Sequence, residues 1–202
     1  MQEYLVDKYN LFNLIFIKNK KNYSILIKDW QEINGKKKKI TKKVLFKTPL
    51  MTIPFGIEKY FFKDIINLEF LNYEKDNICK NFYSLICQID NFMSKILWNN
   101  KFQNELGLED NFINELKNKK YLSCIKIRPN NFDPLLRTHL SKKGNQINTQ
   151  FFTEDIDKKK SLININNLEK KIGYFVIELS SLWINNDNYG LTWIIKAGKI
   201  IK

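Results

Sequence analysis

Residues 173–202 read Gly173-Tyr-Phe-Val-Ile-Glu-Leu-Ser-Ser-Leu-Trp-Ile-Asn-Asn-Asp-Asn-Tyr-Gly-Leu-Thr-Trp-Ile-Ile-Lys-Ala-Gly-Lys-Ile-Ile-Lys202. In the first part, Phe175, Ile177 and Leu179 alternate with more polar neighbours. A period of two is typical of a half-buried β-strand. The polar cluster Asn185–Gly190 contains residue types that favour turns, and apolar residues resume after it. We therefore predict two antiparallel strands joined by a tight turn.

This closing hairpin contains rings and lysines that suit either a core or a ligand site. Trp193 is predicted to share one face with Ile195, as a core residue or as a base contact, while Lys196 lies on the other face. Tyr189 lies at the predicted turn beside Gly190, so we expect it to be the more exposed ring. In a nucleic-acid binder, Tyr189 would stack on a base and Lys196 would contact phosphate. In an ordinary domain, the same hairpin would only close the core.

The first part of the chain is predicted to be mostly extended. Leu14–Ile17 and Tyr23–Trp30 are apolar runs separated by five polar residues, which is typical of a hairpin. Asn34–Lys43 contains six lysines and is interpreted as a charged loop. Two prolines keep Thr48–Gly56 extended, and Tyr60–Phe70 again has strand character.

The middle of the chain is predicted to be helical. Apolar residues recur at three- and four-residue spacing from Asp76 to Trp98, which indicates an amphipathic helix. Asp76 or Asn77 is expected to cap its first turn. Leu108–Leu116 predicts a second, shorter helix with two carboxylates in its first turn.

Strand character then returns, and no Pro-, Gly- or Ser-rich linker divides the chain. The later strands are predicted at Tyr121–Ile127, Leu135–Leu140 and Gln146–Phe152. Strands, helices and strands in this order favour a mainly β protein of the α+β class, built as an antiparallel sandwich or barrel. We predict a single domain spanning residues 1–202, with a helical insertion at about residues 76–118.

The charge of the chain suggests a polyanionic partner. There are 34 Lys and Arg against 21 Asp and Glu, a formal net charge of +13. Cationic side chains bind nucleic acid by releasing counterions from its phosphates. Alternatively, the many Lys, Asn and Ile residues reflect AT-rich codons. No apolar run approaches the ~20 residues of a membrane helix, and Leu11–Ile17 lacks the flanks of a secretory signal, so we expect no membrane contact.

The cysteines do not form a recognisable motif. Cys79, Cys87 and Cys124 are odd in number and lack C-x-x-C spacing, which suits core positions in a reducing, intracellular compartment. His139 is the only histidine. A zinc site would have to combine it with distant cysteines, so we expect no metal.

Signals for catalysis are weak. The glycine-rich nucleotide motifs, the zinc-protease motif and the serine-hydrolase motif are all absent from the sequence. Asp64 with Glu69, or Glu154 with Asp155 and Asp157, are the alternatives for a magnesium site in a nuclease. Surface carboxylates explain them more simply, so we expect no enzyme activity and no cofactor.

The strongest candidates for a binding surface are basic residues interleaved with rings. The segment Tyr121–Phe132 is predicted to aim Lys126 and Arg128 from one face of a strand, with Ile125 and Ile127 on the other. The alternative is a solvated outer face. The lysine run in Asn34–Lys43 is either a solvated turn or a clamp on a nucleic-acid strand. The residues expected to contact nucleic acid are Lys126, Arg128, Arg137, Lys142, Lys143, Tyr189, Trp193 and Lys196.

Several segments between Thr48 and the C-terminus share the character of one protein family. They are Phe82–Phe92, Trp98–Lys119, Tyr121–Lys126, Asp133–Arg137, Ile177–Trp183 and Tyr189–Trp193. This pattern resembles the single-stranded DNA-binding proteins of large nucleocytoplasmic DNA viruses, a family that includes the African swine fever virus protein. Phage single-stranded DNA-binding proteins close their OB-fold with a similar strand. The chain departs from these proteins at Ala197, where the family often has Gln, and at Lys199–Lys202, where the phage proteins have an acidic, partner-recruiting tail.

The resemblance implies an OB-fold-like antiparallel barrel with an inserted helical hairpin. It also implies sequence-independent binding of single-stranded DNA in viral replication, repair or recombination, in the host cytoplasm or the virion. Viral replication proteins are the implied partners, and preference for DNA over RNA and the oligomeric state stay open. The alternative is a scaffold protein of a virion or replication complex, which would need an exposed apolar surface rather than a basic groove.

Overall fold

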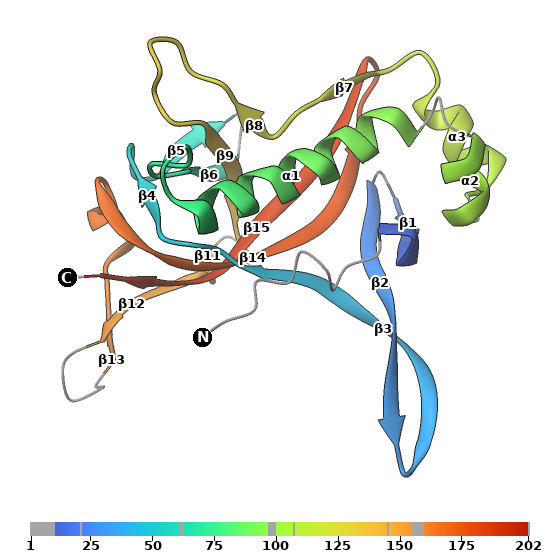
Figure 1. Ribbon diagram of the computed structural model, residues 1–202, viewed down its shortest axis with the longest axis horizontal. Coiled ribbons are helices and arrows are strands. Elements are labelled where there is room, and N and C mark those ends of the chain that lie inside the picture. The colour runs from blue at the N-terminus through green and yellow to red at the C-terminus, as the bar shows by residue number, and fades with distance from the viewer. Residues whose placement is uncertain are drawn as a thin grey trace.

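The long C-terminal hairpin organises the fold (Figure 1). The computed structural model describes residues 11–20, 22–60, 63–96, 100–106, 108–144, 146–154 and 160–201. Within them, β14 (Lys171–Ile184) and β15 (Asn188–Ile200) pair antiparallel from Gly173↔Ile200 to Ile184↔Tyr189. The predicted strand–turn–strand is therefore confirmed. Two register shifts bend β14, one between Val176 and Ile177 and one between Leu179 and Ser181.

Five strands close into a barrel. β14 pairs with β4 (Met51–Ile53), β4 with β6 (Lys63–Glu69), and β6 with β9 (Leu135–Leu140). β9 then runs parallel to β15, which returns to β14 and closes the ring. A five-stranded, mainly antiparallel barrel whose third and fifth strands pair in parallel has the connectivity of the OB fold. The predicted fold class, mainly β with helices and an OB-fold-like barrel, is confirmed.

Short strands extend the barrel sheet. They are β5 (Glu58–Tyr60) on β6, β7 (Lys120–Leu122) on β15, β8 (Ile125–Lys126) on β9, β12 (Gln150–Glu154) on β15 and β13 (Lys160–Leu162) on β12. A separate ribbon pairs β10 (Lys142–Lys143) with β11 (Gln146–Ile147). Tyr121–Ile127 and Gln146–Phe152 were each expected as one strand. Each is interrupted instead, because its two halves pair with different neighbours.

The N-terminal strands combine a confirmed prediction with a wrong one. β1 (Leu14–Asn19) and β2 (Asn22–Ile33) form the predicted hairpin. The lysine-rich segment expected to be a loop is instead strand β3 (Lys36–Lys47), paired with β2 as far as Ile33↔Lys36. The turn is only Asn34–Gly35, at φ 54° and 74°. Asn-Gly is a strong hairpin signal, and lysines are compatible with a ribbon that has water on both faces.

The described residues between β6 and β7 contain three α-helices. α1 (Asn77–Lys95) is the predicted long helix, and the Asp76 carboxylate accepts hydrogen bonds from the backbone N–H groups of Ile78 and Cys79 at 2.8 and 3.3 Å. Leu97 and Trp98 lie outside the described residues. The expected second helix is α3 (Asp110–Leu116), and α2 (Asn100–Leu106) precedes it within the stretch expected to be helical, as a separate helix that was not distinguished from sequence. None of the described helices is both long and apolar enough to cross a lipid bilayer.

The apolar stripe of α1 packs on the barrel. Phe82, Ile86 and Ile89 are at most 3% exposed and join the same core as the inward residues of β14 and β15. Two polar contacts fix the helix over the β15 edge. The Tyr121 hydroxyl donates to the Asp90 carboxylate at 2.5 Å, and the Tyr189 hydroxyl donates to the Met93 carbonyl at 3.4 Å.

Ile89→Ala is expected to lower the free energy of unfolding by roughly 2–5 kcal/mol, since it truncates a side chain that is 1% exposed in this core. Urea denaturation measures the change, and Lys80→Ala on the exposed face of the same helix is the control. A variant that keeps wild-type stability but loses ligand binding would contradict the structural role of α1.

Candidate nucleic-acid interface

A pocket of about 400 Å³ lies on the outside of the barrel, across β6 and β9 and beside the turn between β14 and β15. It is bounded by the β4–β6 connection, by the segment after β7 and by the closing hairpin. Its lining residues are Tyr60, Lys63, Leu122, Ser123, Cys124, Arg137, His139, Trp183, Asn185, Asn188 and Leu191. Among these described residues there are two cationic side chains and no carboxylate.

Strand alternation places the polar side chains of β9 on this outer face. Leu136, Thr138 and Leu140 are buried, whereas Arg137 and His139 are half-buried on the opposite side. In the ladder with β6, Arg137 pairs with Asn67 and His139 with Ile65. A period of two therefore gives one strand both a core face and a ligand face.

Arg137 is held in position by a ring. Its guanidinium lies over the Tyr60 ring, with Cζ 4.1 Å from the ring centroid. The Arg137 Nε atom is buried and has no hydrogen-bond partner among the described residues, and the same holds for Nδ1 of His139. Buried polar atoms are normally paired. Both atoms are enclosed, so a ligand in the pocket can reach only the other atoms of these half-buried side chains.

Positive charges crowd this face. The pKa of His139 is lowered from 6.5 to about 4 by burial and by the nearby charges of Lys63 and Arg137, so the imidazole is neutral at pH 7. The pKa of Lys126, on β8, is lowered by burial and then by the charge of Arg137, while Glu58 opposes the shift. An anion in the pocket would relieve this repulsion, because opposite charges favour the protonated forms.

Trp183 forms one wall of the pocket. It is the ladder partner of Gly190 on β15, and a Cβ at Gly190 would lie 2.8 Å from Cζ2 of the ring and 2.7 Å from the Leu122 carbonyl oxygen. Glycine therefore lets the indole and strand β7 approach the hairpin closely. The ring is half-buried, which leaves part of it facing the pocket.

Among the residues predicted from sequence, Arg137 lines the pocket and Lys126 lies beside it. Arg128 does not lie free on a strand. Its guanidinium forms an ion pair with Glu69 and donates from Nε to the Asp133 carbonyl at 2.7 Å. The expected core face of this segment is also wrong, since Ile127 is 72% exposed. The segment leaves the sheet after Lys126 and loops out.

The other predicted lysines lie outside the pocket. Lys142 pairs with the buried Asp64 at 2.5 Å, and together with Lys59 it lowers the pKa of that carboxyl. Lys143 is exposed on β10. Lys196 lies 3.4 Å from Glu178 on the neighbouring strand.

Tyr189 and Trp193 are core residues. They are 1% and 0% exposed, and Trp193 packs against Phe46 with ring centroids 5.5 Å apart. The expectation of an exposed Tyr189 is wrong, because the turn between β14 and β15 is shorter than predicted. Tyr189 already pairs with Ile184 and points into the core beneath α1.

Among the described lining residues, only Arg137 was nominated from sequence as a ligand contact. The missed residues that carry a ring or a charge are Tyr60, Lys63, His139 and Trp183. A signal for Trp183 existed. The alternation of the strand places Trp183 on the face opposite Leu182, and the hairpin pairs Trp183 with Gly190. No comparable local signal brings Tyr60 to Arg137, because their contact depends on the pairing of β5, β6 and β9.

The carboxylates considered for a nuclease do not meet. Asp64 is bound by Lys59 and Lys142, and Glu69 by Arg128. Glu154 pairs with Lys199, and its proposed partners Asp155 and Asp157 lie outside the described residues. Across the described chain, no group of three or more His, Cys, Asp or Glu side chains is arranged to hold a metal ion.

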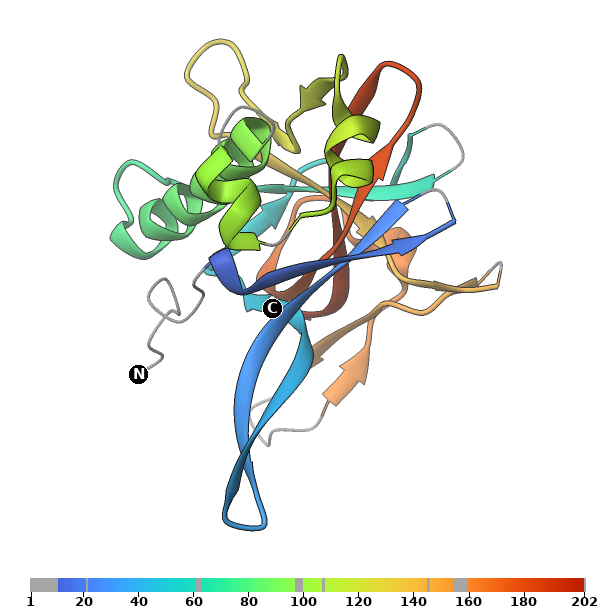
Figure 2. The same ribbon diagram turned by 90° about the vertical axis from the view of Figure 1, so that its right-hand side faces the viewer.

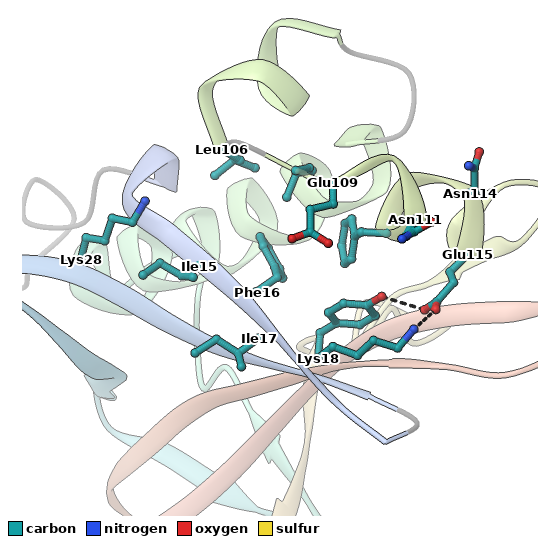
Figure 3. A pocket seen from close by; sticks show the side chains of 13 residues that line it. Ile15, Phe16, Ile17, Lys18, Lys28, Leu106, Glu109, Asn111, Asn114 and Glu115 are labelled. Carbon is teal, nitrogen blue, oxygen red and sulfur yellow. Dashed lines mark hydrogen bonds and ion pairs between the residues drawn. The ribbon is translucent and has the colours of Figure 1, made fainter.

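A second hollow, of about 900 Å³, separates β1 and β2 from α2 and α3 (Figure 3). One end is closed by Glu115, which accepts a hydrogen bond from the Tyr23 hydroxyl at 2.8 Å and forms an ion pair with Lys18. The Phe112 ring packs edge-on against Tyr23, with centroids 4.6 Å apart. These contacts attach α3 to the sheet. Glu109 also lines the hollow, so it suits phosphate less well than the first pocket.

No protein-family model matches the sequence, and no curated protein matches it. Among solved structures, the chain is similar to gp2.5, a single-stranded DNA-binding protein encoded by bacteriophage T7. The identity is 12%, the match covers 79% of this chain and 92% of the phage protein, and the TM-score is 0.46. At this level, the likeness assigns neither a family nor a function to the chain.

His139 predicts a pH-dependent stability. Its folded-state pKa of about 4 lies below the unfolded value of 6.5, so the unfolded chain binds the proton more tightly. The native state should therefore lose up to roughly 3 kcal/mol of stability as pH falls from 6.5 to 4. Urea denaturation of wild type and His139→Gln across this range isolates the effect. A difference between the two proteins that does not change with pH would contradict it.

Proposed function

We propose that this protein binds single-stranded DNA without sequence preference, using the pocket across β6 and β9 as the nucleotide site. The observation that supports this most directly is the charge of the pocket, whose described lining contains the cations Lys63 and Arg137 and no carboxylate. A phosphate offers charge and several acceptor oxygens, which match the guanidinium.

The position of the pocket agrees with the general use of this barrel. OB folds bind oligonucleotides on the face of their second and third strands and with the loops that join strands one to two and four to five. Here those elements are β6 and β9, the β4–β6 connection containing Tyr60, and the turn containing Asn185. This support is an analogy at the level of the fold, and the charge of the pocket is independent of it.

The proposed mechanism is binding without turnover. Arg137, Lys63 and Lys126 neutralise phosphates and release counterions. The partly exposed face of Trp183 supplies a platform on which one base stacks, and stacking is indifferent to base identity because every base has a π-face. Asn185 and Asn188 contribute amide groups at the rim.

The alternatives have less support. A nuclease needs carboxylates in the pocket, and none is among its described lining residues. A scaffold role needs a continuous exposed apolar surface. Ile127 and Phe132, at 72% and 60% exposed, lie on one loop, and the Phe132 ring is covered on one side by Arg128.

The biological setting is part of the proposal and rests on the sequence resemblance alone. In that setting, the protein coats single strands during replication, repair or recombination of a large DNA virus, in the host cytoplasm, and contacts other replication proteins. Gel-shift titration with single-stranded DNA, double-stranded DNA and RNA of matched length tests the ligand class. Tighter binding to the duplex would overturn the proposal.

Binding is expected to weaken steeply with salt, and the pocket cations are expected to set part of that slope. For single strands, each phosphate contact contributes about 0.7 to the slope of log K against log salt. Arg137→Ala combined with Lys126→Ala should therefore flatten the slope by about 1.4. Fluorescence anisotropy over a salt series measures it. Arg128→Ala is the matched control, because its guanidinium is already bound to Glu69. An equal effect of the control would contradict this assignment.

Trp183→Ala is expected to weaken single-strand binding by roughly 1–3 kcal/mol, the usual value of one stacked base. Trp183→Phe should retain much of the affinity, because it preserves a ring. In wild type, the stacked base should quench indole fluorescence, and the quench should shrink in Trp183→Phe. Trp193→Phe serves as the control for a buried indole. Full quenching in Trp183→Phe would place the contact at another tryptophan.

A further inference from the structure

A two-stranded ribbon extends from the barrel into solvent (Figures 1 and 2). We call residues 28–41 the β2–β3 arm. Its six ladder pairs run from Lys28↔Thr41 to Ile33↔Lys36, and the turn Asn34–Gly35 closes it. At ~3.4 Å per residue the paired part is ~20 Å long. No described neighbour pairs with the arm itself. β1 pairs with β2 only up to Ile27, and β14 pairs with β2 up to Ser24 and with β3 only from Val44 onward.

The arm does not contribute to the hydrophobic core. None of its described side chains is buried. A two-stranded hairpin without a hydrophobic face is marginally stable by itself, so the arm is not explained by the packing of the barrel. Its exposed surface is the feature that requires a role.

One face of the arm combines a ring with cations. Trp30 is 64% exposed and is the direct ladder partner of Lys39. Residues two apart on a strand share a face, so Lys28 lies beside Trp30 on its own strand. Across the ladder, Lys37 shares this face next to Lys39. Glu32, the partner of Lys37, is the carboxylate on the same face.

The lysines are available to a ligand. The arm has five of them, Lys28 and Lys36–Lys39, against the carboxylates Asp29 and Glu32. Asp29 is already paired with Lys42 at 2.8 Å. Among the described residues, Lys36–Lys39 have no ion-pair partner. An exposed indole framed by free ammonium groups complements a base flanked by phosphates.

The arm and the pocket are two separate places on the protein. Trp183 in the pocket is the ladder partner of Asn22, and Trp30 lies eight residues further along the same strand. Along the ribbon this corresponds to ~27 Å. One strand of nucleic acid has to be long enough to reach both sites.

We infer that the β2–β3 arm is a second single-strand contact, in which Trp30 stacks on a base and Lys28, Lys37 and Lys39 bind the flanking phosphates. The inference rests on the proposed function in one respect: the pocket is taken to hold another part of the same DNA strand. Joining two contacts on one protein makes the second one intramolecular, so it raises affinity only for strands that span both.

The test compares oligo(dT) of about 6 nucleotides, within the range bound by one barrel, with oligo(dT) of about 30 nucleotides, beyond it. The variants are Trp30→Ala, Trp30→Phe and the double change Lys37→Ala/Lys39→Ala. The matched control is Lys80→Ala/Lys170→Ala, which removes two exposed lysines elsewhere. Thermal melting verifies that each variant folds.

For the long oligonucleotide, Trp30→Ala should bind roughly 5- to 100-fold more weakly, Trp30→Phe should retain most of the affinity, and the double lysine variant should flatten the salt slope by about 1.4. The short oligonucleotide should bind all variants like wild type.

Wild-type affinity of Trp30→Ala for the long strand would overturn the inference, and so would an equal loss for both lengths. A larger loss on a duplex than on the single strand would overturn the single-stranded occupant. If wild type does not bind the short strand, the pocket proposal fails, and the arm is still judged by the long strand.

Discussion

Every part of this fold depends on β14 pairing along both of its edges. On one edge it meets β15 over almost its full length, and on the other it meets β4, β3 and β2 in succession. A straight strand cannot serve partners that diverge in this way, and the two register shifts supply the bend. Because β14 is bent, its first residues, Lys171–Gly173, pair with β4 and close the ring of five strands. Its later residues pair with β3 and then with β2, and so support the N-terminal strands.

This closure also determines where a ligand site can form. When β9 is forced to lie parallel to β15, its outer face is brought beside the β14–β15 turn, and Arg137 and His139 come to lie near Trp183. Residues from three distant parts of the chain then surround one pocket. The burial and the charge repulsion that lower the pKa of His139 and Lys126 follow from the same convergence. The site is therefore a product of the barrel topology, with α1 stabilising the opposite side of the sheet.

The sequence was most informative where one element determines its own structure. The alternation of Phe175, Ile177 and Leu179 and the helical spacing from Asp76 were sufficient for β14 and α1, because burial imposes the period directly. The arm was misread because its lysines are compatible with loop and strand alike, and only Asn34–Gly35 distinguished the two. Tyr189 was misplaced by a turn estimated too long, since it already belongs to β15 and shares the buried face of Leu191 and Trp193. The contacts of Arg137 with Tyr60 and of Arg128 with Glu69 join distant segments, and no local pattern encodes them.

The position of β15 in the chain has a consequence for biosynthesis. This strand pairs with β14, β9, β7 and β12, and it is the last strand that the structure describes. During translation, the earlier strands therefore emerge with their apolar faces and hydrogen-bonding edges uncovered, and the ring cannot form until residues near Ile200 have left the ribosome. Such non-local closure is slow and leaves nascent chains prone to aggregation. Folding yield should then depend on how long a chain that still lacks β15 is protected by chaperones.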